Sequence, residues 1–485
     1  MNRHHPRLLI SAAHKSSGKT TISIGLCQAL RDRGIALQPF KKGPDYIDPM
    51  WLSAAAGRTC RNLDFYLMER AEIVSYFERH AAGADLALIE GNKGLYDGLD
   101  LDGGNSNAAL AALLRAPVVL VIDARGMTRG IAPLILGFQA FDRDIDIAGV
   151  VLNNLGGARH EAKLRAVIEH YTDVPVVGAV HHDARIEIVE RHLGLMPSNE
   201  SAEASARIGE IGAAVARQVD LDRVLKIAGW LPSTRRRGGA AAVAAVTSAP
   251  AADVRIGWAR DRAFGFYYAD DLEALRQAGA QLVPVDTLHD SRLPALDALF
   301  IGGGFPERLM QELEANAALR ADIRRAALGG LPVYAECGGL MYLARSISWN
   351  GITRQMTGVI PADVVMHDKP AGRGYVRLRE TDRHPWPQLA AAGSDGEVSA
   401  HEFHYSTLEN IGAGVSFGYE MLRGFGIDGR RDGITCHNVF ACYAHLRSVG
   451  AHNWAQRFVA FARRIKAGAR QSAAAAVKRE PEPVC

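Results

Sequence analysis

The chain of 485 residues is too long for a single hydrophobic core, so we expect at least two domains. Its apolar fraction of 48% and charged fraction of 22% are typical of a soluble globular protein. A formal net charge of +3 is too small to indicate a nucleic-acid or membrane-surface partner, and no apolar run reaches the roughly 18 residues of a spanning helix. The N-terminal residues lack a signal-peptide pattern, and six cysteines in so long a chain indicate a reducing compartment. We therefore expect a cytoplasmic protein with no nucleic-acid and no membrane partner.

The sequence SAAHKSSGKTT at residues 11–21 is the first motif with a chemical meaning. An apolar run at residues 8–10 precedes it and a helical pattern at residues 21–30 follows, so it lies between a strand and a helix. Such a loop presents backbone N–H groups and a helix N-terminus to phosphates, while Lys19 reaches the β- and γ-phosphates. Ala13 stands where the P-loop pattern has glycine, and the alternative is a serine- and glycine-rich turn without a ligand. We predict an ATP site formed by Ser16, Ser17, Gly18, Lys19, Thr20 and Thr21.

Short apolar runs alternate with helix-length segments through the first half of the chain. This pattern predicts a doubly wound α/β domain with a parallel sheet, which we place at residues 1–231. A Pro-, Gly- and Ala-rich stretch at residues 232–252 is predicted to be a linker. A second α/β domain follows at residues 253–465, and residues 466–485, which end in Cys485, are predicted to be a disordered tail. The runs that indicate strands are residues 36–40, 86–89, 118–122, 147–152 and 174–180, then 254–258, 281–285, 298–301 and 332–335.

Polar residues follow the predicted strands of the first domain, at the edge where α/β sheets bind ligands. The segment KKGPDYIDP supplies Asp45 and Asp48, and the segment EGNKGLYDG supplies Glu90 and Asp97. We predict that Asp48 and Glu90 hold Mg²⁺ with the Thr20 hydroxyl. Loop caps and turns are the alternative role for each acid. Asp123 and Asn153 are expected at the same edge. Asp123 is a candidate to face the nucleotide, and Asn153 is either a partner of the nucleotide base or a helix N-cap.

Cys337 lies in LPVYAECGGLMYLA, between a predicted strand and a predicted helix. This turn exposes the sulfur and places the thiolate at a helix N-terminus, which favours a nucleophile. The candidate bases are His401, His404, His437 and His445. Cys436, His437, Cys442 and His445 are also zinc-ligand types. If residues 435–445 form one strand, however, the two cysteines and the two histidines face opposite sides, so we predict no metal there and expect both cysteines in the core.

The segments SSGKTT, KKGPDYIDP, NLDFY, EGNKGLYDG and ERHLGLMPSNE resemble the cobyrinic acid a,c-diamide synthase family, whose synthetase half is similar to dethiobiotin synthetase. The resemblance implies a ligase that amidates the a and c acetate carboxylates of cobyrinate or hydrogenobyrinate, in cobalamin biosynthesis. It implies ATP and Mg²⁺ as cofactors, an acyl-phosphate intermediate, and L-glutamine and a tetrapyrrole-derived polycarboxylate as partners. A homodimer is the candidate assembly. The residues expected near the substrate are Asp45, Tyr46, Lys93 and Asp97.

The second half resembles the class I-like glutamine amidotransferase domains of cobyrinate and cobyrate synthases, through RDRAFGFYY, FIGGGFPE, YAECGGLMYL, HEFHYS and YAHL. The resemblance implies that His445 is the partner of Cys337. That family usually lacks the acidic third member of a catalytic triad, and Leu446 and Arg447 follow His445, so we expect no acid here. The oxyanion hole is expected at Gly303, Gly304 and Gly338.

Two segments depart from the pattern of the synthase family. Trp51 and Leu52 replace an aromatic residue and a histidine, and Asn92 and Lys93 replace an apolar pair. We expect both changes near the substrate, where the positive charge of Lys93 would meet another carboxylate. The substrate would then be a relative of cobyrinate, and sirohaem is the candidate. Two further alternatives are a P-loop regulatory ATPase with a degenerate amidase domain, and cobyrate synthase, which should lack KKGPDYIDP.

Overall fold

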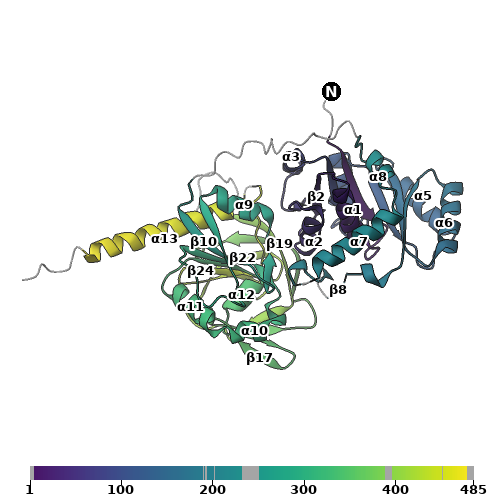
Figure 1. Ribbon diagram of the computed structural model, residues 1–485. Coiled ribbons are helices and arrows are strands. Elements are labelled where there is room, and N and C mark those ends of the chain that lie inside the picture. The colour runs from purple at the N-terminus through teal and green to yellow at the C-terminus, as the bar shows by residue number, and fades with distance from the viewer. Residues whose placement is uncertain are drawn as a thin grey trace, which may run out of the picture. The chain divides into compact units, whose positions relative to one another are not determined.

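The computed structural model describes residues 5–188, 190–191, 194–200, 203–231, 251–387, 396–450 and 452–477. The chain divides into two compact units, Met1–Val246 and Thr247–Cys485 (Figure 1). The division falls in the predicted linker, but residues 232–250 lie outside the described part, so the linker stays a prediction. Within the described residues, no helix combines the length and the apolar character needed to cross a bilayer.

The first unit is built on a parallel sheet whose strands are almost entirely buried. Buried runs of Val, Ile and Leu form such strands because helices cover both faces of the sheet. This confirms the doubly wound α/β prediction. From one edge to the other, the seven described strands are β3 (Arg61–Leu63), β2 (Leu37–Lys42), β4 (Leu86–Glu90), β1 (Arg7–Ala12), β5 (Val118–Asp123), β6 (Ile147–Leu155) and β7 (Val176–His181).

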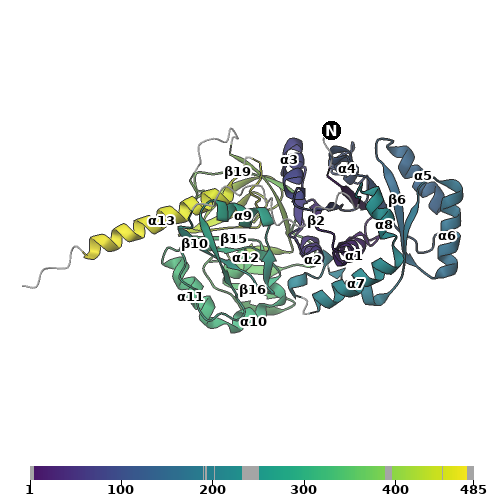
Figure 2. The same cartoon turned by 45° about the horizontal axis from the view of Figure 1, so that its top comes forward.

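Helices lie on both faces of this sheet (Figure 2). Helices α1 (Lys19–Asp32), α2 (Ile47–Ala56) and α7 (Ala204–Gln218) pack together on one face. Right-handed crossovers place α3 (Arg70–Ala81), α4 (Asn107–Leu114), α5 (Ile131–Phe141) and α6 (Ala158–Tyr171) on the other. The remaining elements are α8 (Leu221–Ile227) and the short pair β8 (Glu190–Arg191) and β9 (Gly194–Leu195). The loops that follow β1, β2 and β4 therefore meet at one edge of the sheet, where α1 and α2 begin.

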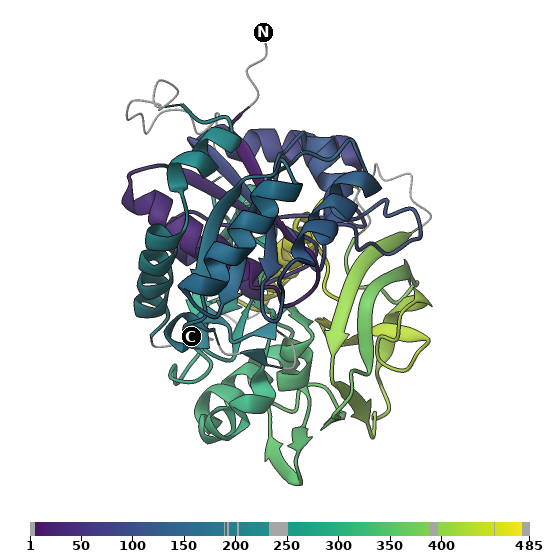
Figure 3. The same ribbon diagram turned by 90° about the vertical axis from the view of Figure 1, so that its right-hand side faces the viewer.

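The second unit contains a mixed sheet, which confirms the predicted second α/β domain. Its parallel part consists of β12 (Ala280–Val285), β10 (Val254–Ala259), β13 (Ala298–Ile301), β15 (Val333–Glu336) and β24 (Val439–Cys442). Antiparallel strands continue from β24 and are coloured light green to yellow in Figure 3: β23 (Arg431–Cys436), β22 (Ser416–Arg423), β19 (Gly372–Glu380) and β20 (Glu397–His404). Smaller strands are β11 (Phe264–Phe266), β14 (Gly303–Gly304), β16 (Ser346–Trp349), β17 (Ile352–Gln355), β18 (Asp363–Met366) and β21 (Ser406–Glu409).

Two hydrophobic cores cover the two faces of the mixed sheet. One includes residues of α10 (Met310–Ala315), α11 (Ala317–Leu328) and α12 (Gly338–Leu343), and the other includes residues of α9 (Ala269–Gln277) and α13 (Trp454–Val477). Helix α13 corrects the predicted tail, because residues 466–477 are helical rather than disordered. Alanine has the highest intrinsic helix propensity, so this Ala-rich segment extends a helix whose first turns are anchored in the core. Residues 478–485, with Cys485, lie outside the described part.

Residues 435–445 do not form one strand, which was the condition for placing the two cysteines and the two histidines on opposite sides, because β23 and β24 form a hairpin there. The chain reverses at His437, whose φ of 51° is left-handed, and Asn438 follows. His and Asn tolerate this conformation better than most residues. Cys436 and Cys442 belong to the two cores, as predicted. The described residues contain no group of three or more His, Cys, Asp or Glu side chains that could hold a metal ion.

Candidate active sites

The P-loop has the backbone that its sequence requires. Ser16 and Gly18 are left-handed, with φ of 62° and 89°. Asn153 reaches this loop from the end of β6, and its Nδ2 donates to the Ser17 carbonyl at 3.0 Å. A Cβ at Gly18 would lie 2.0 Å from Asn153 Nδ2, so only glycine fits. Asn153 therefore braces the phosphate loop and does not cap a helix, since α6 begins after Gly157.

The three residues predicted to hold a metal lie together at the end of the sheet. Thr20 and Thr21 follow Lys19 in the first turn of α1. Thr20 Oγ1 donates to Glu90 Oε1 at 2.7 Å and lies 3.4 Å from Asp48 Oδ2. Lys19 is buried beside them, and this burial, together with the charge of Lys41, lowers the pKa of Lys19 to about 8. Phosphate oxygens bound in the P-loop would therefore meet hydroxyl, carboxylate and amine groups at one point.

Lys41 is a member of this cluster that the sequence reasoning missed. Its side chain is 3% exposed, and its Nζ donates to Asp48 Oδ2 at 2.5 Å and to Glu90 Oε1 at 2.9 Å. Burial alone would lower the pKa of Lys41, but the charges of these carboxylates raise it well above its usual value. Although burial opposes it, the same ammonium holds the pKa of Asp48 below its usual value. The sequence offered one signal for Lys41, namely a lysine within a strand whose other residues are buried.

The residues present fit a bound Mg²⁺ ion. Glu90 Oε2 is buried without a hydrogen-bond partner among the described residues. Asp48 and the Thr20 hydroxyl add two more oxygen donors, and Mg²⁺ at nucleotide sites takes one or two carboxylates together with phosphate oxygens and water. The ammonium of Lys41 shows that this cluster accommodates positive charge.

The four residues predicted near the substrate fall into two pairs. Asp45 Oδ1 accepts the N–H groups of Ile47 and Asp48 and so caps α2, and Tyr46 is buried at the N-cap position. Lys93 and Asp97 are exposed in the loop after β4. Asp97 Oδ2 accepts the Gly94 N–H at 2.8 Å.

Asn107, at the start of α4, holds that loop and was also missed. Its Nδ2 donates to the carbonyls of Asn92 and Gly94, at 2.5 and 2.8 Å, and its Oδ1 accepts the Asn92 N–H at 3.1 Å. A further contact, of 3.0 Å between Nδ2 and Ser11 Oγ, joins the loop to the end of β1. Nothing in the local sequence distinguishes this asparagine from an ordinary helix-start residue.

Trp51 and Asp123, at the synthetase edge, are both engaged by other groups of the protein. Trp51 and Leu52 are 1% and 0% exposed, and Trp51 Nε1 donates to the Met196 carbonyl at 2.8 Å. Helix α2 thus turns both side chains into the core, and their expected place near the substrate stays a prediction. Asp123 is engaged by Arg125, whose guanidinium donates to both of its oxygens.

Cys337 occupies a strained turn between β15 and α12. Its φ of 47° and ψ of −102° are unusual for a residue with a side chain, and they lift the sulfur out of the strand. A Cβ at Gly339 would lie 2.1 Å from the Ile301 carbonyl oxygen, so the turn can approach β13 only with glycine. The sequence ECGG thus specifies the turn that the nucleophile reading required.

His445 is the histidine that pairs with Cys337. Burial alone would lower its pKa, but hydrogen bonds to Cys337 and Glu336 raise the pKa of His445 to about 10. The His401 ring stacks on His445, with centroids 4.9 Å apart. His404 Nδ1 donates to the Ser406 carbonyl, and His437 lies in the hairpin turn. Of the four candidate bases, the structure brings His445 into position.

The predicted oxyanion glycines surround this pair. A Cβ at Gly303 would lie 2.7 Å from His445 Cε1, and a Cβ at Gly338 would lie 2.9 Å from the Gly304 carbonyl oxygen. The backbones of β14 and of the turn after Cys337 therefore approach each other without side chains between them. Such close backbone approach is what an N–H pocket for a developing oxyanion needs.

The expectation of no acidic third member is wrong. Glu336 Oε2 lies 3.3 Å from His445 Nδ1. The acid comes from the residue before the cysteine rather than from one after the histidine, because β15 and β24 are neighbours and pair Glu336 with Cys442. Spacing after His445 could not reveal an acid contributed by the adjacent strand.

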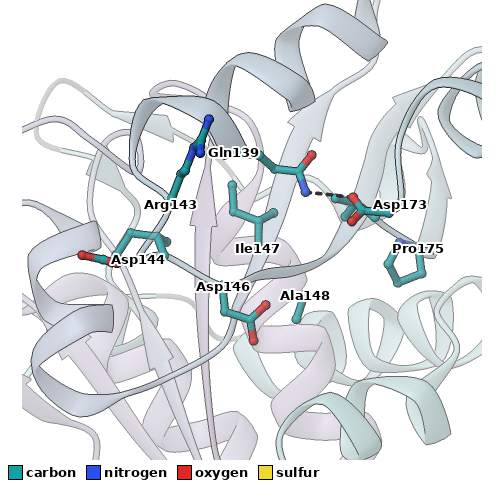
Figure 4. Close-up of a pocket in the computed structure, with 10 residues that line it drawn as sticks. Gln139, Arg143, Asp144, Asp146, Ile147, Ala148, Asp173 and Pro175 are labelled. Carbon is teal, nitrogen blue, oxygen red and sulfur yellow. Dashed lines mark hydrogen bonds between the residues drawn. The ribbon is translucent and has the colours of Figure 1, made fainter.

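A separate shallow pocket of about 520 Å³ lies where β6 and β7 begin (Figure 4). Gln139 Nε2 donates to Asp173 Oδ1 across it at 3.0 Å. Ligands of open α/β sheets bind at the opposite, carboxyl ends of the strands. This pocket is therefore distinct from the candidate nucleotide site.

A P-loop beside buried carboxylates and a Cys–His pair at a strained turn define the chain as a nucleotide-binding domain joined to an amidotransferase domain. Residues 9–195 match the CobQ/CobB/MinD/ParA nucleotide binding domain, and residues 255–452 match the CobB/CobQ-like glutamine amidotransferase domain.

Three relatives extend this match over nearly the whole chain. The cobyrinate a,c-diamide synthase of Magnetococcus marinus is 47% identical and aligns 93% of this chain with 96% of its own length. The synthases of Methanosarcina acetivorans and Listeria innocua are 42% and 36% identical, over 95% and 91% of this chain and 96% of each relative. The chain belongs to the cobyrinate a,c-diamide synthase family. It is a ligase that takes its amide nitrogen from glutamine.

Proposed function

We propose that this protein uses ATP and glutamine to amidate the a and c acetate carboxylates of cobyrinate or hydrogenobyrinate in cobalamin biosynthesis. The observation that carries the proposal is that one chain holds both a charged P-loop edge around Lys19 and Glu90 and a Cys337–His445 pair. The names of the relatives support this choice of substrate.

The P-loop edge would activate the substrate carboxylate. In this scheme a carboxylate oxygen attacks the γ-phosphorus, ADP leaves, and ammonia then displaces phosphate from the acyl phosphate. The carboxylate is itself the nucleophile, so no protein base is needed. Lys19 and Lys41 offset negative charge around the transferring group, and Lys93 and Asp97 present polar groups to the substrate. Thr20, Asp48 and Glu90 would hold Mg²⁺, which when bound neutralises phosphate charge.

The second centre would release the ammonia. The Cys337 thiolate attacks the carboxamide carbon of glutamine, and the oxyanion forms beside Gly303, Gly304 and Gly338. His445 then gives its proton to the amide nitrogen as the C–N bond breaks, so ammonia departs and a thioester remains on the sulfur. Water, with its proton taken by His445, hydrolyses the thioester to glutamate.

Sirohaem is the alternative substrate, and the exposed Lys93 is the observation that favours it. Mass spectrometry of products from cobyrinate, its metal-free analogue and sirohaem, offered in parallel with ATP, Mg²⁺ and glutamine, tests both. Conversion of cobyrinate or hydrogenobyrinate to the diamide supports the proposal. Amidation of sirohaem alone contradicts it and supports the alternative.

A regulatory P-loop ATPase with a degenerate amidase domain predicts a different outcome. Such a protein hydrolyses no glutamine, whatever acceptor is present. The hydrogen bond between His445 and Cys337 argues against degeneration. Glutamine hydrolysis that rises when ATP and an acceptor are added excludes this alternative.

A further inference from the structure

The carboxylate of Glu336 lies in the glutaminase centre, but neither the ECGG motif nor the residues that follow His445 assign it a role. We infer that Glu336 is a positioning residue that keeps His445 in the tautomer whose Nε2 serves Cys337. The inference rests on the proposed glutaminase reaction and adds to it a residue that orients the base.

Glu336 is fixed in place by partners on two neighbouring strands and their extensions. Its Oε1 accepts the Tyr334 hydroxyl at 2.5 Å and the Leu446 N–H at 3.0 Å. Its Oε2 is then left facing His445 Nδ1 at 3.3 Å. Since Leu446 directly follows His445, the bond that anchors the carboxylate also fixes it relative to the backbone of the histidine.

This arrangement assigns the two ring nitrogens of His445. A carboxylate accepts and does not donate, so the proton of the neutral ring stays on Nδ1, facing Glu336. Nε2 can then take the proton of Cys337 and later give it to the nitrogen that leaves as ammonia. Once the imidazolium has formed, the nearby negative charge stabilises it, as the buried aspartate does in serine-protease triads.

The other groups around the pair do not replace this carboxylate. The His401 ring stacks on His445, and its own bonds to His445 run between the two backbones. Burial, then the charges of His445 and Arg447, lower the pKa of His401 well below its usual value, so it stays neutral. Five further titratable groups interact electrostatically with Glu336 or Cys337: Tyr267, Asp271, Tyr334, Cys442 and Tyr443.

A purely structural role for Glu336 is the competing explanation, because it also secures Tyr334 and Leu446. Glu336→Gln separates the two roles, since the amide oxygen still accepts both anchoring bonds but the negative charge is gone. The matched control is Glu402→Gln. Glu402 is equally buried, accepts the N–H groups of Phe425 and Gly426 at 2.7 Å each, and lies 3.6 Å from a different histidine, His404.

The experiment measures glutamine hydrolysis without acceptor across pH, together with the rate at which iodoacetamide alkylates Cys337. For Glu336→Gln we expect kcat to fall by about 100-fold or more with the KM for glutamine changed by less than about threefold. Removal of the carboxylate lowers the pKa of His445, so the alkaline limb of the profile and of the alkylation rate moves to lower pH. Glu402→Gln keeps the parent profile, and ammonium-dependent amidation by both variants shows that they are folded.

Two results overturn the inference: hydrolysis by Glu336→Gln within about threefold of the parent at an unchanged alkaline limb, or the same shift in Glu402→Gln. Failure of the proposed function looks different. If glutamine is hydrolysed but no corrinoid is amidated, the substrate assignment fails while the profiles still test Glu336. If even the parent hydrolyses no glutamine, the proposed function fails, and the alkylation rates alone support or overturn the role of Glu336.

Discussion

The two candidate centres of this chain are built in different ways. The glutaminase centre is complete within the fold: a strained turn holds Cys337, a hydrogen bond joins it to His445, and Glu336 lies behind the ring. The synthetase edge is instead a balance of charges, in which Lys41 lies among carboxylates that a metal ion would also use. The glutaminase centre depends on close backbone contacts that leave no room for a larger side chain. The synthetase edge depends on the attraction between oppositely charged side chains.

This difference determines how a substitution in each centre affects activity and stability. A catalytic group that backbone contacts hold in place can be removed without disturbing the rest of its domain. Removal of one member of a buried charge cluster leaves the others unpaired, which costs folding free energy as well as activity. Substitutions in the two centres are therefore expected to differ in their effect on stability.

Cys337→Ala is expected to have the largest effect. It removes the nucleophile, so glutamine-dependent amidation falls by at least about 10⁴-fold. Amidation with free ammonium is retained, because the P-loop edge is untouched. Rates with each nitrogen source, measured on the same preparation, check this. Loss of both activities would mean that the cysteine is structural.

Lys19→Ala is the reciprocal change. It removes a charge that contacts the transferring phosphoryl group, and we expect ATP-dependent amidation to fall by about 10³-fold with either nitrogen source. Basal glutamine hydrolysis survives, because Cys337 and His445 are unchanged. Coupled measurement of ADP and glutamate release separates the two centres, and unchanged ADP release would contradict the P-loop assignment.

The sequence revealed the two centres to different depths. SSGKTT and ECGG were informative because each is a short sequence that specifies a turn: Gly18 is left-handed, and Gly339 has no Cβ to collide with the Ile301 carbonyl. Alternating buried runs likewise predicted both sheets. The hairpin at His437 was missed because its short turn contains neither glycine nor proline, and continuous apolar strands on both sides looked like one element.

The side chains that the sequence reasoning missed act across strands. Lys41 contacts Glu90, 49 residues further along the chain, and Glu336 contacts His445 across 109 residues. Strand order brings these pairs together, and no local pattern encodes strand order. The burial of Trp51 was not foreseen for a related reason, because Met196, whose carbonyl accepts its indole N–H, lies 145 residues further along the chain.

Lys41→Met tests whether charge balance holds the synthetase edge. It leaves Asp48 and Glu90 without their ammonium, and we expect the free energy of unfolding to fall by about 3 kcal/mol. Mg²⁺ should restore part of this loss, because a divalent cation offsets the same carboxylates. Urea unfolding with and without Mg²⁺ measures both effects.

The matched control is Lys42→Met. Lys42 is the next residue of β2 and is similarly buried, but it donates to the neutral Asn92 side-chain oxygen at 3.1 Å, and the carboxylate whose charge acts on it is Asp64, not Asp48 or Glu90. We expect a smaller loss, about 1 kcal/mol, that does not respond to Mg²⁺. Equal losses in the two variants, or no recovery with Mg²⁺ in Lys41→Met, would show that the cluster is not organised by charge.

Gly303→Ala probes the backbone contacts of the glutaminase centre and is expected to have a smaller effect than Cys337→Ala. Its new Cβ would lie 2.7 Å from His445 Cε1, so the ring must shift by a fraction of an ångström. Since small displacements of a catalytic group are costly, glutamine-dependent kcat should fall by about 10-fold to 100-fold while ammonium-dependent amidation is unchanged. Gly468→Ala, where a Cβ on α13 meets no atom within 4 Å, is the control and should leave both rates unchanged. A Gly303→Ala variant with parental glutamine turnover would mean that His445 is not held by this contact, and that the contrast between a packed centre and a charged one is too strong.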